Sequence, residues 1–160
     1  MKSGMMGREM AKEQWKGIGS MKIIQQEIQE DRDLIRQKVV EHNRKNLPEL
    51  QDRPYGNISF IARDDEDGVI GGITCTYYWQ HLHIDFLWVD PAQRGSGIAS
   101  RLVGKAERYA RELECRLMTV DTFSFQAPDF YRKQGFREFG RIEDHPAGHS
   151  QHYFEKRLTE

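Results

Sequence analysis

One stretch near the middle of the chain, "HLHIDFLWVDPAQRGSGIASRL" (residues 81–102), constrains the fold more than any other. Its first nine residues alternate and then run apolar, as in a half-buried strand, and Asp90-Pro91 ends that pattern. A glycine turn follows and leads directly into residues with helical spacing. Such a strand–turn–helix unit is typical of a mixed α/β sheet rather than of a helical bundle or an all-β sandwich.

The rest of the chain supplies further strands and helices. Alternating, β-rich runs predict strands over 21–24, 57–63, 69–79, 82–89, 116–123, 136–142 and 152–158. Apolar residues at helical spacing predict helices over 31–43, 96–113 and 124–134, the last with Ser124 as its N-cap. The acidic run "DDEDG" (64–68) is interpreted as a hairpin turn. This order predicts a mostly antiparallel mixed sheet flanked by helices, with strand–helix–strand units in its second half.

Charge and composition exclude several classes of protein. Lys and Arg number 24 against 25 Asp and Glu, so the net charge of −1 gives no attraction to nucleic acid or to an anionic membrane surface. No apolar run reaches the roughly 20 residues of a membrane helix. Two cysteines without CxxC spacing indicate a reduced, cytoplasmic protein. Residues 1–20 are interpreted as an N-terminal extension, for which disorder is one expectation, and residues 21–160 as one domain.

The glycine turn has the features of an anion site. A helix N-terminus presents unpaired amides and a partial positive charge. Gly95 and Gly97 allow an anion to approach that backbone closely. The stretch matches neither GxxxxGK[ST] nor GxGxxG with a ribose-binding acid downstream. A tight turn that binds no ligand is the other explanation of these glycines.

Two segments resemble the GCN5-related N-acetyltransferases (GNAT family). "AQRGSG" (92–97) is similar to the family's [QR]-x-x-G-x-[GA], with Ala92 at the first position. "SFQAPDFYRKQGF" (124–136) is similar to the family's NxxAxxFYxxxGF, with Ser124 where Asn is usual. The C-terminal "GRIEDHPAGHSQHYFEKRL" resembles one branch of small bacterial acetyltransferases. The resemblance implies the family fold over residues 21–158, splayed at the strand Leu82–Val89.

The same resemblance implies acetyl-CoA as co-substrate, lying in the gap that the splayed strand leaves. The strand backbone is expected to bind the pantetheine arm, and the amides of the glycine turn its pyrophosphate. The Val89 amide is the candidate to stabilise the oxyanion of the reaction. The expected cofactor-binding residues are Leu87, Trp88, Val89, Arg94, Gly95, Ser96, Gly97, Ile98, Ala99 and Ser124.

Strand alternation places His81, His83 and Asp85 on one face. An amine must be neutral to attack a thioester, so a base has to remove its proton, and similar family members carry a Glu or a His pair at the last two positions. His83 is the first candidate for this base. Asp85 orients it, shares its role or binds a cationic acceptor. Polar side chains at a partly open strand end are the other explanation of these three residues. Tyr131 matches the family's general acid.

The sequence therefore predicts an acetyl-CoA-dependent N-acetyltransferase that acts by direct attack of a primary amine, and a small molecule is the expected acceptor. The alternatives are a non-catalytic acyl-CoA-binding or regulatory module and the transfer of a longer acyl group. No metal is expected, because no cysteine lies at ligand spacing beside the histidines and this reaction needs none. An exposed strand at the C-terminal edge of the sheet is compatible with a homodimer.

Overall fold

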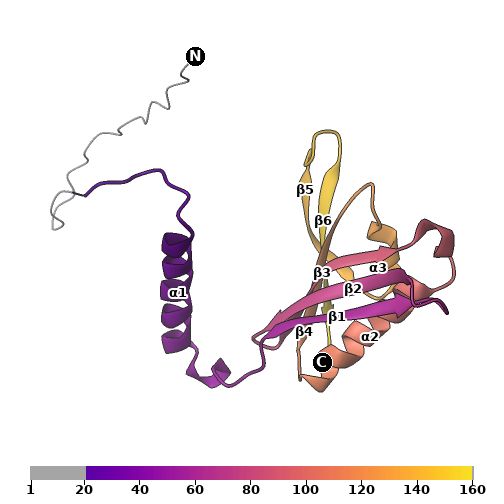
Figure 1. Ribbon diagram of the computed structural model, residues 1–160, viewed down its shortest axis with the longest axis horizontal. Coiled ribbons are helices and arrows are strands. Elements are labelled where there is room, and N and C mark those ends of the chain that lie inside the picture. Colours follow the sequence, from indigo (N-terminus) through magenta and orange to yellow (C-terminus); the bar gives the residue numbers. More distant parts are fainter. Residues whose placement is uncertain (1–20, 160) are drawn as a thin grey trace, which may run out of the picture. The chain divides into compact units, whose positions relative to one another are not determined.

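The computed structural model describes residues 21–159, and the chain divides after Pro48 into two units that are described separately. The first unit contains helix α1 (Gln29–Asn46), shown in indigo in Figure 1, which confirms the helix expected over 31–43. The strand expected over 21–24 is wrong. That run is irregular because no strand of the sheet pairs with it, and a strand is not stable without a partner. A single domain over 21–160 stays a prediction, and the extension 1–20 lies outside the described residues.

The second unit begins at Glu49, within the short 3₁₀ helix η1 (Pro48–Leu50), and is built on a six-stranded sheet of order β1-β2-β3-β4-β6-β5. All neighbours are antiparallel except β3 and β4, so the predicted mixed, mostly antiparallel sheet is confirmed. The edges are β1 and β5, and the C-terminal strand lies inside the sheet; a homodimer stays a prediction. The strands are β1 (Gly56–Arg63), β2 (Val69–Tyr78), β3 (His81–Val89), β4 (Leu117–Phe123), β5 (Arg137–Glu143) and β6 (Ser150–Arg157).

Two helices follow the strands that the sequence assigns them, α2 (Ile98–Glu112) after β3 and α3 (Pro128–Lys133) after β4. The apolar stripe of α2 lies on the sheet and is buried at Leu102, Val103, Ala106 and Ala110. Opposite it, the sheet contributes the buried side chains Ile73, Cys75, Leu82, Ile84 and Met118. Within the described residues, no helix combines the length and the apolar character that crossing a membrane requires.

The N-cap expected for helix α3, Ser124, is wrong. Helix α3 is capped by Ala127 without a side-chain hydrogen bond, and it begins at Pro128 because proline suits the first helical position. Ser124 lies before this start, in the turn after β4. Its Oγ accepts a hydrogen bond from the Ser150 amide at 3.2 Å and so joins the turn to β6.

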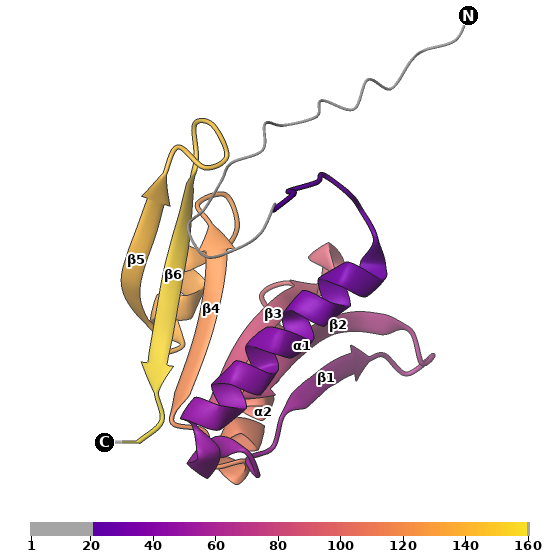
Figure 2. The same ribbon diagram turned by 90° about the vertical axis from the view of Figure 1, so that its left-hand side faces the viewer.

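Strand β3 changes partners halfway along its length. It pairs with β4 only over His81–Ile84, opposite Leu117–Val120. The next residue, Asp85, is the extra residue of a β-bulge, because Ile84 faces Cys75 and Phe86 faces Thr74 on β2. From the bulge onward β3 keeps β2 as its only partner, and Figure 2 shows β3 and β4 diverging. The predicted splay is confirmed and begins at this bulge.

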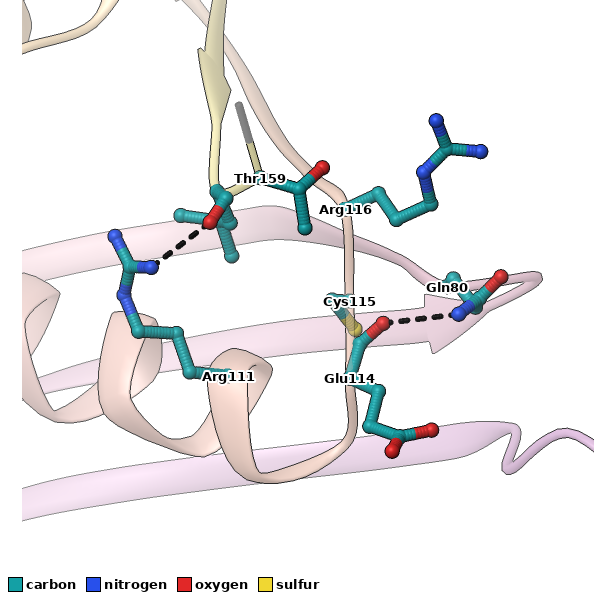
Figure 3. A pocket seen from close by; sticks show the side chains of 7 residues that line it. Gln80, Arg111, Glu114, Cys115, Arg116 and Thr159 are labelled. Carbon is teal, nitrogen blue, oxygen red and sulfur yellow. Dashed lines mark hydrogen bonds between the residues drawn. The ribbon is translucent and has the colours of Figure 1, made fainter.

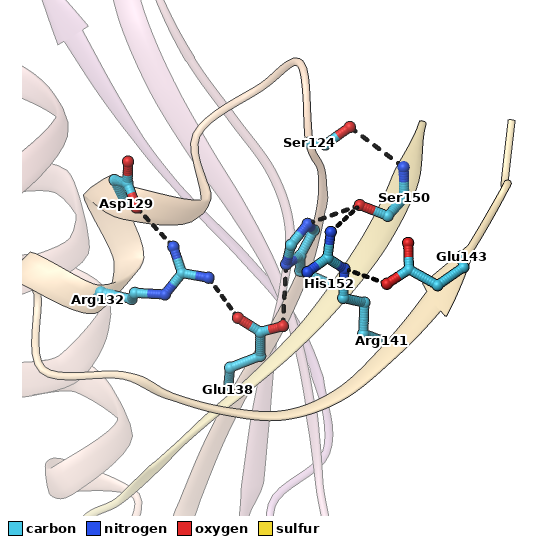
Figure 4. Close-up of polar contacts among 8 residues, drawn as sticks. All are labelled: Ser124, Asp129, Arg132, Glu138, Arg141, Glu143, Ser150 and His152. Carbon is cyan, nitrogen blue, oxygen red and sulfur yellow. Dashed lines mark hydrogen bonds and ion pairs between the residues drawn. The ribbon is translucent and has the colours of Figure 1, made fainter. Parts of the chain in front are cut away.

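A partly buried polar network fastens α3 to the last two strands (Figure 4). His152, 4% exposed, places Nδ1 3.0 Å from Glu138 Oε1 and Nε2 2.9 Å from Ser150 Oγ. Arg141 donates to the same Ser150 oxygen at 3.1 Å, and Arg132 of α3 donates to Glu138. Since a guanidinium only donates, the Ser150 hydroxyl can donate to Nε2 and a neutral His152 can donate from Nδ1. Every member is then satisfied, and α3 is held at Arg132.

This network predicts an acid-dependent contribution to stability. Burial raises the pKa of Glu138, but the hydrogen bonds from Arg132 and His152 outweigh it and hold that pKa below its usual range. The lowered pKa stabilises the fold above the unfolded value, near 4.3, and the effect is lost as the pH falls through the folded value. Glu138→Gln should therefore lower the free energy of unfolding by about 1–2 kcal/mol at pH 7, and by less below pH 4, in urea denaturation.

The matched control is Glu143→Gln on the same strand. Glu143 is 71% exposed and pairs with Arg141 at the surface, so its replacement should change the free energy of unfolding by less than about 0.5 kcal/mol. An effect of Glu138→Gln that is equal at pH 7 and pH 3.5 contradicts the assignment.

Candidate functional site

The glycine turn between β3 and α2 forms an open, amide-lined surface. The 3₁₀ helix η2 (Pro91–Gln93) starts it, and Asp90 caps that helix by accepting from the Ala92 amide at 2.8 Å. Gly95 and Gly97 both have φ +82°, the left-handed region that favours glycine, and a Cβ on either would meet nothing within 4 Å. Gly97 is the N-cap of α2. The first amides of α2, which lack partners within the helix, therefore lie beside open space.

A cavity of about 300 Å³ lies at this turn. It contains six of the ten predicted cofactor-binding residues: Val89, Arg94, Gly95, Gly97, Ile98 and Ala99. Gln93, Ser100 and Phe130 complete its lining and were not predicted, although Gln93 stands only one position from the glutamine of the family motif. The lining carries a guanidinium and no carboxylate. With the positive end of α2 beside it, the cavity is suited to a phosphate group.

The free edge of β3 runs from this cavity towards the point where the strands part. Asp90 donates its amide to Ile70 of β2 at 2.9 Å, and hydrogen-bonding directions alternate along a strand. The amides and carbonyls of Leu87 and Val89 therefore point away from β2, on the side where β4 no longer pairs, and the Val89 carbonyl accepts from Arg94 Nε at 3.5 Å. An extended ligand can bind this edge as an added strand would.

Three other predicted cofactor contacts lie outside the lining of the cavity. The backbone of Trp88 faces β2, because it alternates with its neighbours Leu87 and Val89. The Ser96 hydroxyl donates to the Gln93 carbonyl within the turn, and Ser124 is bound to β6. Their contact with a cofactor stays a prediction.

A row of side chains from β3 and β4 meets where the two strands part. His83 Nδ1 lies 2.8 Å from Thr119 Oγ1, and His81 Nε2 lies 2.7 Å from the same oxygen. On its other side, His83 Nε2 lies 3.6 Å from Asp121 Oδ1. Gln151 of β6 donates to Asp121 Oδ2 at 2.7 Å. The imidazole of His83 is thus flanked by a hydroxyl and a carboxylate, both from β4.

The carboxylate beside His83 is not the one that the sequence singled out. Asp85 occupies the bulge, and its Oδ2 accepts from Thr76 of β2 at 2.9 Å. Thr119 and Asp121 were missed. Their signal was present in "LMTVDTF", where polar residues alternate as His81 and His83 do, but only the strand pairing brings the two rows together.

Burial sets the protonation state of His81. Burial, followed by the charge of His83, lowers the pKa of His81 below its ordinary value. His81 is therefore neutral near pH 7 and can accept a hydrogen bond on one ring nitrogen.

Tyr131 of α3 is buried in an aromatic environment. It is 5% exposed, and its ring contacts Phe130, Phe136 and Phe154. Within the described residues its hydroxyl makes no hydrogen bond. Burial above all, with the negative charge of Asp121, raises the pKa of Tyr131 to about 12. The phenol therefore keeps its proton at neutral pH, as a general acid must.

The two thiols are free and buried. Burial, and then the charge of Asp85, raises the pKa of Cys75 to about 12, and burial raises that of Cys115. Neither favours the thiolate that an acyl-cysteine route needs, in line with the direct attack that the sequence predicts. Among residues 21–159, no three His, Cys, Asp or Glu side chains gather as a metal site.

A larger cavity, of about 560 Å³, lies at the opposite end of α2 (Figure 3). Arg111 donates to the Leu158 carbonyl at 2.9 Å, and Gln80 donates to the Glu114 carbonyl at 3.1 Å. Helix α2 has 15 residues, so about 20 Å separates this cavity from the glycine turn. Its lining contains none of the predicted site residues: Gln80, Arg111, Glu114, Cys115, Arg116, Leu158 and Thr159.

Comparison with known proteins gives consistent matches. The family model described as "Acetyltransferase (GNAT) family" matches residues 24–136. Blasticidin-S acetyltransferase of Streptomyces morookaense is 38% identical over 115 residues, which cover 71% of this chain and 85% of the relative. The crystal structure of an acetyltransferase from Bacillus cereus is 46% identical, covers 86% of this chain and 98% of its own, and has a TM-score of 0.78.

A more distant structure, aminoglycoside 6′-N-acetyltransferase complexed with coenzyme A, is 17% identical and shares the fold. The match covers 80% of this chain and 88% of that one, with a TM-score of 0.58. The family model spans the glycine turn, the splayed strand and Tyr131, which are the features on which the resemblance in sequence depends. The chain therefore belongs to the GNAT family and is an acetyltransferase.

Proposed function

We propose that this acetyltransferase transfers acetyl from acetyl-CoA to a primary amine of a small molecule by direct attack. The observation that carries the proposal is the parting of β3 and β4 after Ile84. His83 lies in the pair just before the last one, and the backbone of β3 beyond it does not pair with β4. The phosphate-suited cavity at Gly97 includes Val89 at the end of the same strand.

The residues present fit acetyl-CoA. The amides at the start of α2, with Arg94, are suited to its pyrophosphate, and the free edge at Leu87 and Val89 is suited to the amide groups of its pantetheine arm. The cofactor supplies an acetyl thioester. The Val89 amide points into the same gap and is placed to stabilise negative charge that develops on the carbonyl oxygen.

In the proposed reaction the amine nitrogen attacks the thioester carbonyl, so that a C–N bond forms and the C–S bond breaks. His83 accepts the proton that the amine loses. Tyr131, which burial keeps protonated, gives its proton to the departing sulfur. Asp85 is held by Thr76, and its second oxygen is suited to a cationic group of the acceptor.

A small-molecule acceptor is supported by the names of two matched proteins, which denote blasticidin S and an aminoglycoside. Phe86 and Trp88, 76% and 48% exposed, supply aromatic surface near Asp85 on β3. Aromatic faces and a carboxylate together favour a cationic molecule.

Cofactor binding is tested by calorimetric titration with acetyl-CoA. The intact protein should bind with micromolar affinity, and Gly97→Asp should weaken binding tenfold or more, roughly, because a carboxylate then lies beside the phosphate-suited amides. Gly148→Asp is the matched control, because Gly148 has φ +79° and equally open surroundings but lies in the β5–β6 turn. No binding of acetyl-CoA to the intact protein overturns the proposal.

Turnover is tested with Tyr131→Phe. Loss of the proton donor should lower kcat by about 10²-fold and leave the affinity for acetyl-CoA unchanged, in an assay of thiol release with a panel of amines that includes blasticidin S. The control is Tyr109→Phe on α2, which removes a hydroxyl that lies 3.5 Å from the Tyr77 hydroxyl of β2 and should leave kcat unchanged.

Two results of this assay favour the alternatives. Binding of acetyl-CoA without turnover of any amine indicates a binding module, and faster turnover of octanoyl-CoA indicates a longer acyl group. Equal kcat in Tyr131→Phe and the intact protein rules out Tyr131 as the acid.

A further inference from the structure

We propose that Asp121 is the charge partner of His83 and that Thr119 holds the imidazole in the form that accepts a proton. Both act as positioning residues, and the inference rests on the function proposed above. The two residues bracket the His83 ring from β4, one at each nitrogen.

The strand register produces this arrangement. His83 pairs with Thr119, and Ile84 with Val120 is the last pair before β3 and β4 part. Thr119 and Asp121 alternate along β4 and so lie on one face, with Asp121 just beyond the last pair. The imidazole therefore lies where the gap begins, with its Nε2 on the side of Asp121.

Thr119 links the protonation of the two histidines. Its hydroxyl carries one proton, yet it lies within 2.8 Å of a ring nitrogen from each of His81 and His83. It can donate to only one of them and accepts from the other. Because His81 is neutral, its Nε2 can take the Thr119 proton, and Thr119 then accepts from His83 Nδ1. In that arrangement the neutral His83 has its lone pair on Nε2, as a base requires.

Asp121 acts on this nitrogen by charge. The 3.6 Å between His83 Nε2 and Asp121 Oδ1 is too long for a hydrogen bond, so the lone pair stays available to an amine. Once His83 has taken the proton, the carboxylate stabilises the imidazolium. Gln151 fixes the carboxylate by donating to its other oxygen at 2.7 Å.

The same carboxylate also influences the general acid, since its charge helps to raise the pKa of Tyr131. The carboxylate of Asp121 thus lies close to His83 and also acts on Tyr131. The other charged or titratable groups around His83 are His81, held by Thr119, and Asp85, held by Thr76. Cys75 lies buried on the opposite face of the sheet.

The test is the pH–rate profile of Asp121→Asn. We expect kcat to fall by about 10²-fold with the KM for acetyl-CoA unchanged. Both limbs of the profile should move to lower pH, because the imidazolium loses its charge partner and the phenol loses a neighbouring anion. Structural damage alone lowers the plateau without moving the limbs. Asp129→Asn, which removes an 84% exposed carboxylate two residues from Tyr131, should move neither limb.

A second readout needs no turnover. The His83 ring is titrated by NMR in the full chain without ligand, and its titration should move to lower pH in Asp121→Asn and stay in place in Asp129→Asn. An unmoved His83 titration overturns the inference even if the enzyme is active. A moved titration in a protein that acetylates no amine supports the pair and refutes the proposed function alone.

Thr119 is tested by an isosteric pair of variants. Thr119→Val removes the hydroxyl and should lower kcat, whereas Thr119→Ser keeps it and should restore kcat to near the original value. Equal activity of the valine and serine variants overturns the role of the hydroxyl.

Discussion

The short parallel ladder between β3 and β4 is the constraint on which the site depends. Four residue pairs join the strands, and the ladder stops after Ile84 and Val120. Beyond it, the backbone groups of β3 that face away from β2 have no partner on β4. A ladder that ran on to Val89 would satisfy these groups and close the gap. The bulge at Asp85 coincides with the end of the ladder.

Much of the fold could be predicted from the sequence because its signals are local. The strand–turn–helix around Gly97 and the stripe of α2 each lie within about 20 residues, and both were found. The prediction of a strand over 21–24 was wrong because apolar, β-branched residues show that an extended conformation is favourable, not that a partner strand is available. The bulge at Asp85 was missed because one inserted residue resets a two-residue period without any mark in the composition.

The candidate site was predicted in part for the same reason. His83 and Tyr131 could be identified within single segments that resemble a family. Thr119 and Asp121 could not, since their meaning arises from a parallel register with a strand more than 30 residues earlier in the chain. Nothing in "LMTVDTF" alone distinguishes a site from a solvated strand face.

The unequal ladders of this sheet have a mechanical consequence. The proposed base, His83, lies on β3, whose long ladder is with β2, while α3 with Tyr131 is fastened through Glu138 and His152 to β5 and β6. Four pairs between β3 and β4 connect these two halves of the sheet, fewer than in any other ladder of the described chain. A ligand that bound across the gap would therefore connect the two halves of the sheet. Its binding to the folded state alone would raise the free energy of unfolding.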